Sequence, residues 1–441
     1  MINKFFTITL ALCVSFSSFS QVVENNFSLQ EAINYGVENN YSFKNDELDA
    51  EIKRKQAFEV MTEGFPKINA KLDYNFNFEQ QVSLLPAGVF GPEPTEIAFG
   101  APHNATLQVE ATQLIFDARY IYGMKARQGL LKLADTQVEI SEIDTREMIA
   151  KAYYAVLVSE QSYEQLASTQ SIMQSVLDET RAIYEQGFTD ELSVNRLELN
   201  LANLETQISS AEQQAENALM NLKYEIGMPQ EESLVLADDL YSFLTTLSFD
   251  IQDDAAVENR PENTLFETFD KMRTYDIKQA RSVYFPSFYG FASYGTNAQR
   301  DAFNFFNDQR WFDYGMVGFN INIPIFDGLA GRAQVQQRQI QKEQNLNDWE
   351  NFKQGFELQI TTTENNLVTA INEFNTQQDN VALAQKILDK TVIMFNEGIG
   401  SSLELSQAQQ EYTTTQINYS QAIYNLLIAQ LELEKAKGNL K

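Results

Sequence analysis

The segment that decides the fold is SSLELSQAQQEYTTTQINYSQAIYNLLIAQLELEKAK, residues Ser401–Lys437. Small and apolar residues recur in it in alternating steps of three and four for more than four heptads, which is typical of a coiled-coil seam. The seam consists of Leu405, Ala408, Tyr412, Thr415, Tyr419, Ala422, Leu426, Ala429, Leu433 and Ala436. The pattern predicts one long helix packed along a partner helix.

The same pattern occurs earlier in the chain at a constant offset of 211 residues. The earlier seam consists of Val194, Leu197, Leu201, Leu204, Ile208, Ala211, Ala215, Ala218 and Leu222. The same offset relates Gly187 to Gly398 and Gly227 to Gly438. A period this long indicates a duplication rather than a solenoid of short units. We therefore expect two similar halves, each built on long paired helices.

The first residues, 1–20, have the composition of a secretory signal peptide. Lys4 precedes an apolar run, Phe5–Phe16, and Ser18-Phe19-Ser20 provides a small-x-small cleavage site before Gln21. The run is too short to cross a membrane. Lipidation at Cys13 is the alternative, but Leu12 stands where a small residue is required. Cleavage at Gln21 would leave a mature chain without cysteine, and hence without disulfides or thiol chemistry.

Charge and hydropathy argue against a nucleic-acid-binding protein and against a helical membrane anchor. Loss of Lys4 leaves 31 of the 32 basic residues against 61 acidic ones, a net charge of −30, which repels nucleic acid. No later stretch holds eighteen apolar residues, so no transmembrane helix is expected after the signal. For an exported chain without a helical anchor, a closed barrel is the other way to cross a bilayer.

Alternating patterns predict membrane-length strands. Apolar residues occupy every second position in residues 66–78, where Ile68, Leu72 and Tyr74 alternate with polar residues such as Asn69 and Asp73. A Pro- and Gly-rich loop, 85–102, separates this strand from a second one at 104–115. The second half has the strands 286–297 and 314–325. Ten to twelve residues is the length of a tilted membrane strand.

These elements give the organisation of the whole chain. We expect a first repeat at 21–227, a connector at 228–258 and a second repeat at 259–441. Each repeat begins with helix and continues through its two strands into a long helix pair. The predicted helix pairs are 118–185 with 189–226, and 329–396 with 401–437. The longest would extend roughly 100 Å.

The order of short motifs resembles the TolC-like outer-membrane efflux family. The motifs are Asn39-Asn40 and Asn259-Arg260-Pro261-Glu262, Phe65-Pro66 and Phe285-Pro286, Phe116-Asp117 and Phe326-Asp327, and Tyr184–Gly187 and Phe395–Gly398. The resemblance covers nearly the whole mature chain. It implies a mainly helical protein with a β-barrel portion that assembles as a homotrimer, with one barrel in the outer membrane and a helical tunnel in the periplasm.

The resemblance also implies two functional regions. One comprises the helix–helix turns Gln186-Gly187-Phe188 and Glu397-Gly398-Ile399, which would form the periplasmic tip and dock an adaptor of an inner-membrane pump. These turns are equally explained as connections in which glycine supplies a positive φ. The other is an acidic gate at the tunnel entrance, where well-known members carry two acidic rings. Here the pair is Glu404 and Gln407, so one ring would lack its charge; Glu404 also fits a helix cap with Ser401.

The sequence contains no recognisable motif for catalysis, phosphate binding or metal binding. His103 is the only histidine and lies in the loop between the first two strands, where a solvated side chain is the ordinary interpretation. No metal cluster, nucleophile elbow or phosphate loop is present in the sequence. We therefore expect no enzyme, no cofactor and no metal site. The function that fits is a passive export duct that contacts outer-membrane lipid.

Two alternatives remain. A periplasmic coiled-coil scaffold or adaptor without a pore would explain the helices, but it would not need four membrane-length strands. A secreted enzyme with helical spacers would need an active site. Because four strands are too few to close a barrel, a pore requires several chains, and three chains would give twelve strands.

Overall fold

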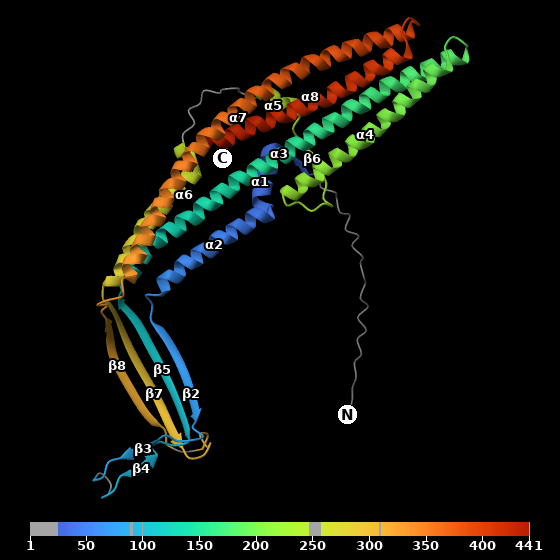
Figure 1. Ribbon diagram of the computed structural model, residues 1–441. Coiled ribbons are helices and arrows are strands. Elements are labelled where there is room, and N and C mark those ends of the chain that lie inside the picture. The colour runs from blue at the N-terminus through green and yellow to red at the C-terminus, as the bar shows by residue number, and fades with distance from the viewer. Residues whose placement is uncertain (1–24, 89–90, 99, 247–256, 308–309, 441) are drawn as a thin grey trace, which may run out of the picture.

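The computed structural model describes residues 25–440 except 89–90, 99, 247–256 and 308–309. The expected signal segment, Cys13 and the cleavage site before Gln21 lie outside the described residues. Figure 1 shows a long, gently curved array of helices with a sheet of long strands at one end and two helix–helix turns at the other. No helix in the described part of the chain is both long and apolar enough to cross a membrane.

The sheet joins strands from both halves of the chain. Its order is β2 (Lys67–Phe76), β5 (His103–Phe116), β7 (Ser287–Arg300) and β8 (Phe312–Asn322), with every neighbouring pair antiparallel. Pairing of β5 with β7 connects the two hairpins. The strand expected to reach Ile325 instead ends at Asn322, because Pro324 has no N–H for a ladder hydrogen bond.

The first hairpin carries an additional element that the sequence analysis did not predict: β4 lies within the expected loop 85–102, and β3 lies mostly just before it. Within it, β3 (Val82–Leu85) and β4 (Thr95–Ala98) form a separate two-stranded antiparallel sheet. Figure 1 shows this small hairpin beyond the far end of the main sheet. The Pro- and Gly-rich composition of the stretch comes from the residues between β3 and β4, so it concealed two strands of four residues each.

The register places the alternating apolar residues of β2 and β5 on the same side of the sheet as several apolar residues of β7 and β8, whereas Phe291, Phe312, Tyr314 and Met316 lie on the other side. Ile68 pairs with Ala111, Ala111 with Ala292, and Ala292 with Val317, and directly paired residues point to the same side. We call this side the apolar sheet face: Ile68, Ala70, Leu72, Tyr74, Phe76, Ala105, Leu107, Val109, Ala111, Ala292, Tyr294, Val317, Phe319 and Ile321. Ile68 is 72% exposed and Val317 is 84% exposed. No described part of the same chain therefore covers the face at these two positions.

Long helices continue from the sheet. In chain order they are α1 (Leu29–Asn39), α2 (Tyr41–Thr62), α3 (Ala118–Glu185), α4 (Glu191–Glu225), α6 (Pro261–Arg281), α7 (Ala330–Asn396) and α8 (Ser402–Lys437). Asp117, at the end of β5, starts α3 by accepting a hydrogen bond from the backbone N–H of Arg119 at 2.7 Å. The 68 residues of α3 extend roughly 100 Å.

The connector between the halves is anchored on α3. It contains β6 (Leu234–Leu236), which pairs in parallel with β1 (Asn25–Phe27), and the short helix α5 (Leu240–Thr246). The hydroxyl of buried Tyr153 donates to the backbone oxygen of Phe27 at 3.0 Å and to Asp238 Oδ2 at 2.9 Å. Asp238 also accepts from the backbone N–H of Leu29 at 2.7 Å. This one carboxylate therefore joins the connector to α3 and to the start of α1.

Buried apolar side chains form two main clusters along the helices. The equatorial cluster surrounds Ile149, Tyr153, Leu222 and Ile423, and includes residues of α1, α3, α4 and α8. The tip cluster includes residues of α3, α4, α7 and α8 near the two turns: Leu166, Met173, Val176, Leu177, Val194, Leu197, Leu201, Leu204, Ala211, Leu388, Leu405 and Ala408. Each cluster contains residues from both halves of the chain.

An ion-pair network joins α3 to α8 beside the equatorial cluster. Glu147 accepts from Lys435 and lies 2.8 Å from the Nζ of Lys151, which also lies 2.7 Å from Glu432. Lys435 is 2.6 Å from Asp144. Burial disfavours the charged form of Glu147, but the two lysines outweigh it, so the pKa of its carboxyl lies below the ordinary value of 4.5.

We expect Glu147→Gln to lower the free energy of unfolding by about 1–3 kcal/mol, because charge-assisted hydrogen bonds on a largely buried side chain are lost. The pKa of Glu147 is depressed in the folded state, so its contribution is present above about pH 4.5 and is lost as the pH falls through the lower, folded value. The difference between wild type and variant should therefore shrink in acid. Thermal unfolding at several pH values measures it.

The matched control is Glu350→Gln, which removes an ion pair with Lys353 whose side chains are 63% and 37% exposed. This change should alter the free energy of unfolding by less than about 0.5 kcal/mol. Equal effects of the two substitutions, or a Glu147 effect that persists unchanged in acid, would contradict the prediction.

Candidate functional site at the helical tip

The two helix–helix turns lie side by side at the end of the molecule farthest from the sheet (Figure 1). Gly187 and Gly398 have φ angles of 80° and 77°, which L-residues with a Cβ rarely adopt. Each turn is closed in the same way: the N–H of Phe188 donates to Ile183 at 3.1 Å, and that of Ile399 donates to Met394 at 3.0 Å. The structure therefore brings together the six residues singled out by sequence.

An apolar side chain projects from each turn. Phe188 is 80% exposed and Ile399 is 69% exposed. Between the turns lies a hollow of about 490 Å³, lined from one side by Ile183, Phe188, Asp190 and Arg196 and from the other by residues including Phe395 and Ser402. An open hollow flanked by exposed apolar side chains is a surface on which a protein partner can bind.

Polar contacts hold the two turns to each other across this hollow. Asn396 donates to Glu179 at 3.0 Å, and Arg196 lies 3.5 Å from the hydroxyl of Ser402. Each contact joins residues more than 200 positions apart in the chain. Sequence analysis missed them, because only the tertiary pairing of the repeats brings these side chains together.

Glu404 forms a complete capping box at the start of α8. Its backbone N–H donates to Ser401 Oγ at 3.2 Å, and its carboxylate accepts from the backbone N–H of Ser401 at 3.0 Å. Gln407 follows three residues later, so it lies on the same side of the helix one turn along, and both residues are exposed. The geometry establishes the cap; a gate requires copies of the chain around a common axis.

The charge of the tip is predominantly negative. Its carboxylates include Glu179, Glu185, Asp190, Glu191, Glu198, Glu397 and Glu404, whereas the basic residues close to the turns are Arg181, Arg196 and Lys390. Arg181 is already paired with Glu198 at 2.7 Å. The tip therefore favours cationic over anionic partners.

The other candidates from the sequence offer no reactive site. His103 was expected in the loop between the first two strands, but it is the first residue of β5 and pairs with Phe76. It lies at the opposite end of the molecule, where its Nδ1 is 2.8 Å from the hydroxyl of Tyr74 and its ring stacks on Phe76 at 4.7 Å. Phe303 and Phe305 complete this aromatic cluster with Tyr74. Within the residues that the structure describes, no group of three or more His, Cys, Asp or Glu side chains could hold a metal ion.

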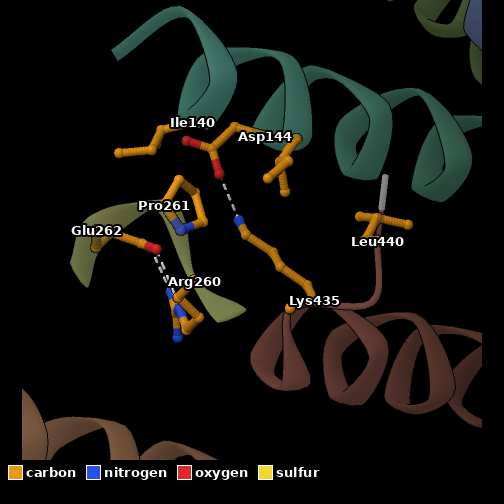
Figure 2. A pocket seen from close by; sticks show the side chains of 9 residues that line it. Ile140, Asp144, Arg260, Pro261, Glu262, Lys435 and Leu440 are labelled. Atoms are coloured by element: carbon orange, nitrogen blue, oxygen red, sulfur yellow. Dashed lines mark hydrogen bonds and ion pairs between the residues drawn. The ribbon is translucent and has the colours of Figure 1, made fainter. Parts of the chain in front are cut away.

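A charged hollow near the end of α8 is too small for a ligand. Figure 2 shows Lys435 pointing to Asp144, and Arg260 pairing with Glu262, around this hollow. Its volume is about 20 Å³, which is space for about one water molecule. The charges here are paired with each other and stabilise the contact among α3, α6 and α8.

Comparison with known proteins identifies the relatives of this chain. Residues 271–439 match the family model of the outer membrane efflux protein. The outer membrane protein TolC of Vibrio cholerae serotype O1 is 22% identical over 423 residues, covering 94% of this chain and 91% of that protein. TolC of Escherichia coli K12 is 22% identical over 367 residues, covering 78% and 71%. These matches confirm the resemblance seen in the sequence motifs.

Solved structures share the fold. The CusC channel superposes with a TM-score of 0.72 at 16% identity over 93% of this chain and 92% of that one. The CmeC outer membrane channel of Campylobacter jejuni gives 0.69 at 14% identity over 100% and 94%. The open state of the MtrE outer membrane channel of Neisseria gonorrhoeae gives 0.68 at 16% identity over 100% and 98%.

We expect the cap and the charge of Glu404 to be separable by mutation. Glu404→Ala removes the acceptor for the Ser401 N–H and should destabilise the protein by about 0.5–1.5 kcal/mol, the contribution of one hydrogen bond. Glu404→Gln keeps an oxygen that can complete the box, so it should cost clearly less. Thermal unfolding of both variants measures the difference; equal losses would show that the charge, not the cap geometry, stabilises the start of α8.

Proposed function

We propose that this chain, a TolC-like outer-membrane efflux protein, forms one third of a passive export duct. The strands cross the outer membrane, and the helices extend through the periplasm to a tip that faces the inner membrane. Substrate moves through the duct under the drive of an inner-membrane pump, which a periplasmic adaptor couples to the tip. The protein itself breaks and forms no covalent bonds in the substrate.

The observation that carries this proposal is the four-stranded sheet with one apolar face and two open edges. β2 and β8 each pair on one side only, so each leaves a row of backbone N–H and C=O groups unpaired. In lipid those groups need partners, and four strands are fewer than the roughly eight of the smallest membrane barrels. A ring of copies, in which β8 of one chain pairs with β2 of the next, satisfies both edges.

The direction of the strands supports this closure. Because each of the three pairings is antiparallel, β2 and β8 run in opposite directions. The β8–β2 pairing between copies is therefore antiparallel as well, and the ring continues the pattern of the sheet. Twelve strands from three copies agree with the trimer that the family resemblance implies. The apolar sheet face would then contact lipid, and the polar side would line the pore.

The helices next to the open strand edges also lack partners. On α2 the stripe of Phe43, Ala50 and Ala57 is buried, whereas Leu48 and Ile52 on the other side are 61% and 53% exposed. On α7, Ile340 and Leu358 are 56% and 68% exposed. Since α2 precedes β2 and α7 follows β8, the closure that joins the strand edges also brings these two apolar faces together.

The competing function is a periplasmic scaffold or adaptor without a pore. Such a protein has no reason to expose an apolar sheet face beside a polar one. The arrangement of the strands therefore favours the duct. For the tip, exposed Phe188 and Ile399 beside the hollow support docking of an adaptor, and the surplus of carboxylates favours a partner with basic residues at the contact.

We expect arginine on the apolar sheet face to impair membrane assembly. Val109→Arg and Phe319→Arg should each cost about 2–4 kcal/mol near the middle of the bilayer. The matched controls are the adjacent positions on the polar side, Gln108→Arg and Asn320→Arg, which should assemble nearly normally. The yield of oligomer extracted from the outer-membrane fraction measures the effect. If arginine on the apolar sheet face gave the same oligomer yield as arginine at the control positions, the result would indicate a water-soluble sheet.

We expect a ring of Glu404 side chains to favour cations at the tunnel entrance and to be blocked by a trivalent cation. Three carboxylates held near one axis attract counter-ions, and the low-dielectric wall strengthens their field. Glu404→Gln should weaken the block while retaining the helix cap, and Gln407→Asp should strengthen it by restoring a second ring.

The measurement is single-channel conductance in planar bilayers with the trivalent cation added on the tip side. Wild type and Glu404→Gln blocked at the same concentration would rule out the gate and leave Glu404 as a cap alone. The capping variant Ser401→Ala, which keeps the carboxylate, should be blocked like wild type.

A further inference from the structure

The side of the sheet opposite the apolar sheet face differs between the two hairpins. On β2 and β5 it carries mainly polar side chains, such as Asn69, Lys71 and Gln108. On β7 and β8 the register places one large apolar or aromatic side chain at each of five successive levels, opposite a small or polar residue of the paired strand. We call these five residues the pore-side stripe: Tyr289, Phe291, Met316, Tyr314 and Phe312.

The pore-side stripe is continuous along the sheet. Its levels follow each other at every second residue, from the pair of Tyr289 with Asn320 to the pair of Asn297 with Phe312. At about 3.4 Å per residue this length is roughly 27 Å, close to the roughly 25 Å apolar band of outer-membrane barrels. Phe312 is 49% exposed and Met316 is 58% exposed. In the proposed duct, the stripe would therefore present apolar side chains to the pore across the whole thickness of the membrane.

The helix end of the pore-side stripe lies at a hollow of ligand size. Tyr289 belongs to the stripe and also lines a hollow of about 600 Å³ where the sheet meets α2, α3 and α6. Pockets of this volume hold drug-sized organic molecules. The hollow carries charges of both signs, and its Arg119 is paired with Asp117 at 2.9 Å. The hollow therefore favours neither sign of ligand charge strongly, and selection by charge depends on groups farther along the stripe.

One carboxylate lies beside the middle of the pore-side stripe. Glu110 of β5 shares a level with Met316 through the pairing of both strands with β7. Lys71 is paired with Asp73 at 2.9 Å, whereas Glu110 has no ion pair among the described residues. Lys67, the first residue of β2, lies at the helix end of the sheet rather than beside the middle of the stripe. A charged ligand on the stripe therefore meets Glu110 first, together with the negative faces of the aromatic rings.

We propose that the pore-side stripe is a binding surface for organic cations that carry an aromatic ring. The ring of the ligand lies against the apolar side chains of the stripe, and its positive charge is stabilised by Glu110 and by the faces of the aromatic residues. Because the levels are evenly spaced, a ligand that leaves one level reaches the next without full return to water. Conduction of such ligands along the stripe rests on the proposed function.

A second explanation is that the rings only cover glycines of the paired strand. Phe291 and Tyr314 each lie where a Cβ on the opposite glycine would be, and an aromatic ring over a glycine stabilises a sheet. This explanation accounts for two of the five levels. Met316 and Phe312 lie opposite a serine and an asparagine, so they can be replaced without uncovering a glycine.

The test uses the full-length protein in planar bilayers and measures how long single ligand ions block the current. The probes are naphthylmethyl-trimethylammonium, tetramethylammonium and naphthalene sulfonate, which separate the effect of the ring from that of the charge. In wild type, the naphthyl cation should block at least about fivefold longer than either of the other two ions. Phe312→Asn/Met316→Ser should remove most of this difference. Glu110→Gln should shorten the blocks by the naphthyl cation without shortening those by the sulfonate.

The control is Asn104→Ala/Thr106→Ala, which shortens two polar side chains on the same side of β5, outside the stripe. It should leave all block times unchanged. Equal block times for the naphthyl cation and tetramethylammonium in wild type would overturn the binding surface, as would a Phe312→Asn/Met316→Ser variant that assembles and is blocked like wild type. Blocks by naphthalene sulfonate that last as long as those by the naphthyl cation would overturn the role of Glu110.

Equilibrium binding separates this inference from the proposed duct. The measurement is fluorescence anisotropy of the naphthyl cation on protein in lipid nanodiscs, with empty nanodiscs as the reference. Binding to Phe312→Asn/Met316→Ser should be at least about fivefold weaker than to wild type, and equal binding would overturn the stripe as a binding surface. A wild type that binds the cation but forms no pore would count against the duct alone. A conducting wild type whose block times do not depend on the stripe would count against the stripe alone.

Discussion

Unpaired backbone at the edges of the sheet is the constraint on which the rest of the structure depends. A strand edge in water can be solvated, but one in lipid leaves each N–H and C=O at a cost of several kcal/mol. β2 and β8 are both open in the single chain, and the apolar sheet face beside them lacks a partner. In the proposed duct, pairing between copies satisfies the two open edges, and lipid covers the apolar sheet face.

Two carboxylates fix the points at which the helices begin after the strands. Each strand pair that would line a pore leads directly into a helix pair, through Asp117 in the first half and Asp327 in the second. Asp117 accepts from the N–H of Arg119, and Asp327 accepts from the N–H groups of Leu329 and Gly331. These carboxylates satisfy backbone donors at the point where sheet changes to helix, so the helices take their direction from the strands.

The sequence predicted the features that repeat with a fixed period. Alternation identified the apolar sheet face, the steps of three and four identified the apolar seam of α8, and glycine identified both turns, because each of these depends on local geometry. Contacts between the halves, such as Asn396 with Glu179, could not be predicted, since nothing in either segment encodes its distant partner. The hairpin of β3 and β4 was missed because strands of four residues carry too little periodicity beside proline and glycine.

Glu404 caps α8, and in the proposed duct the same side chain would also belong to the gate. As a cap, its carboxylate accepts from the N–H of Ser401, so its position is set by the backbone of the turn rather than by a free rotamer. A gate made of like charges needs carboxylates that are held in place, because mutual repulsion would drive mobile carboxylates apart. Hydrogen bonding to the N-terminus of α8 opposes that repulsion and is itself favoured by the helix dipole. The cap is therefore compatible with the proposed gate, because it would supply the fixed geometry that a ring of carboxylates around an axis requires.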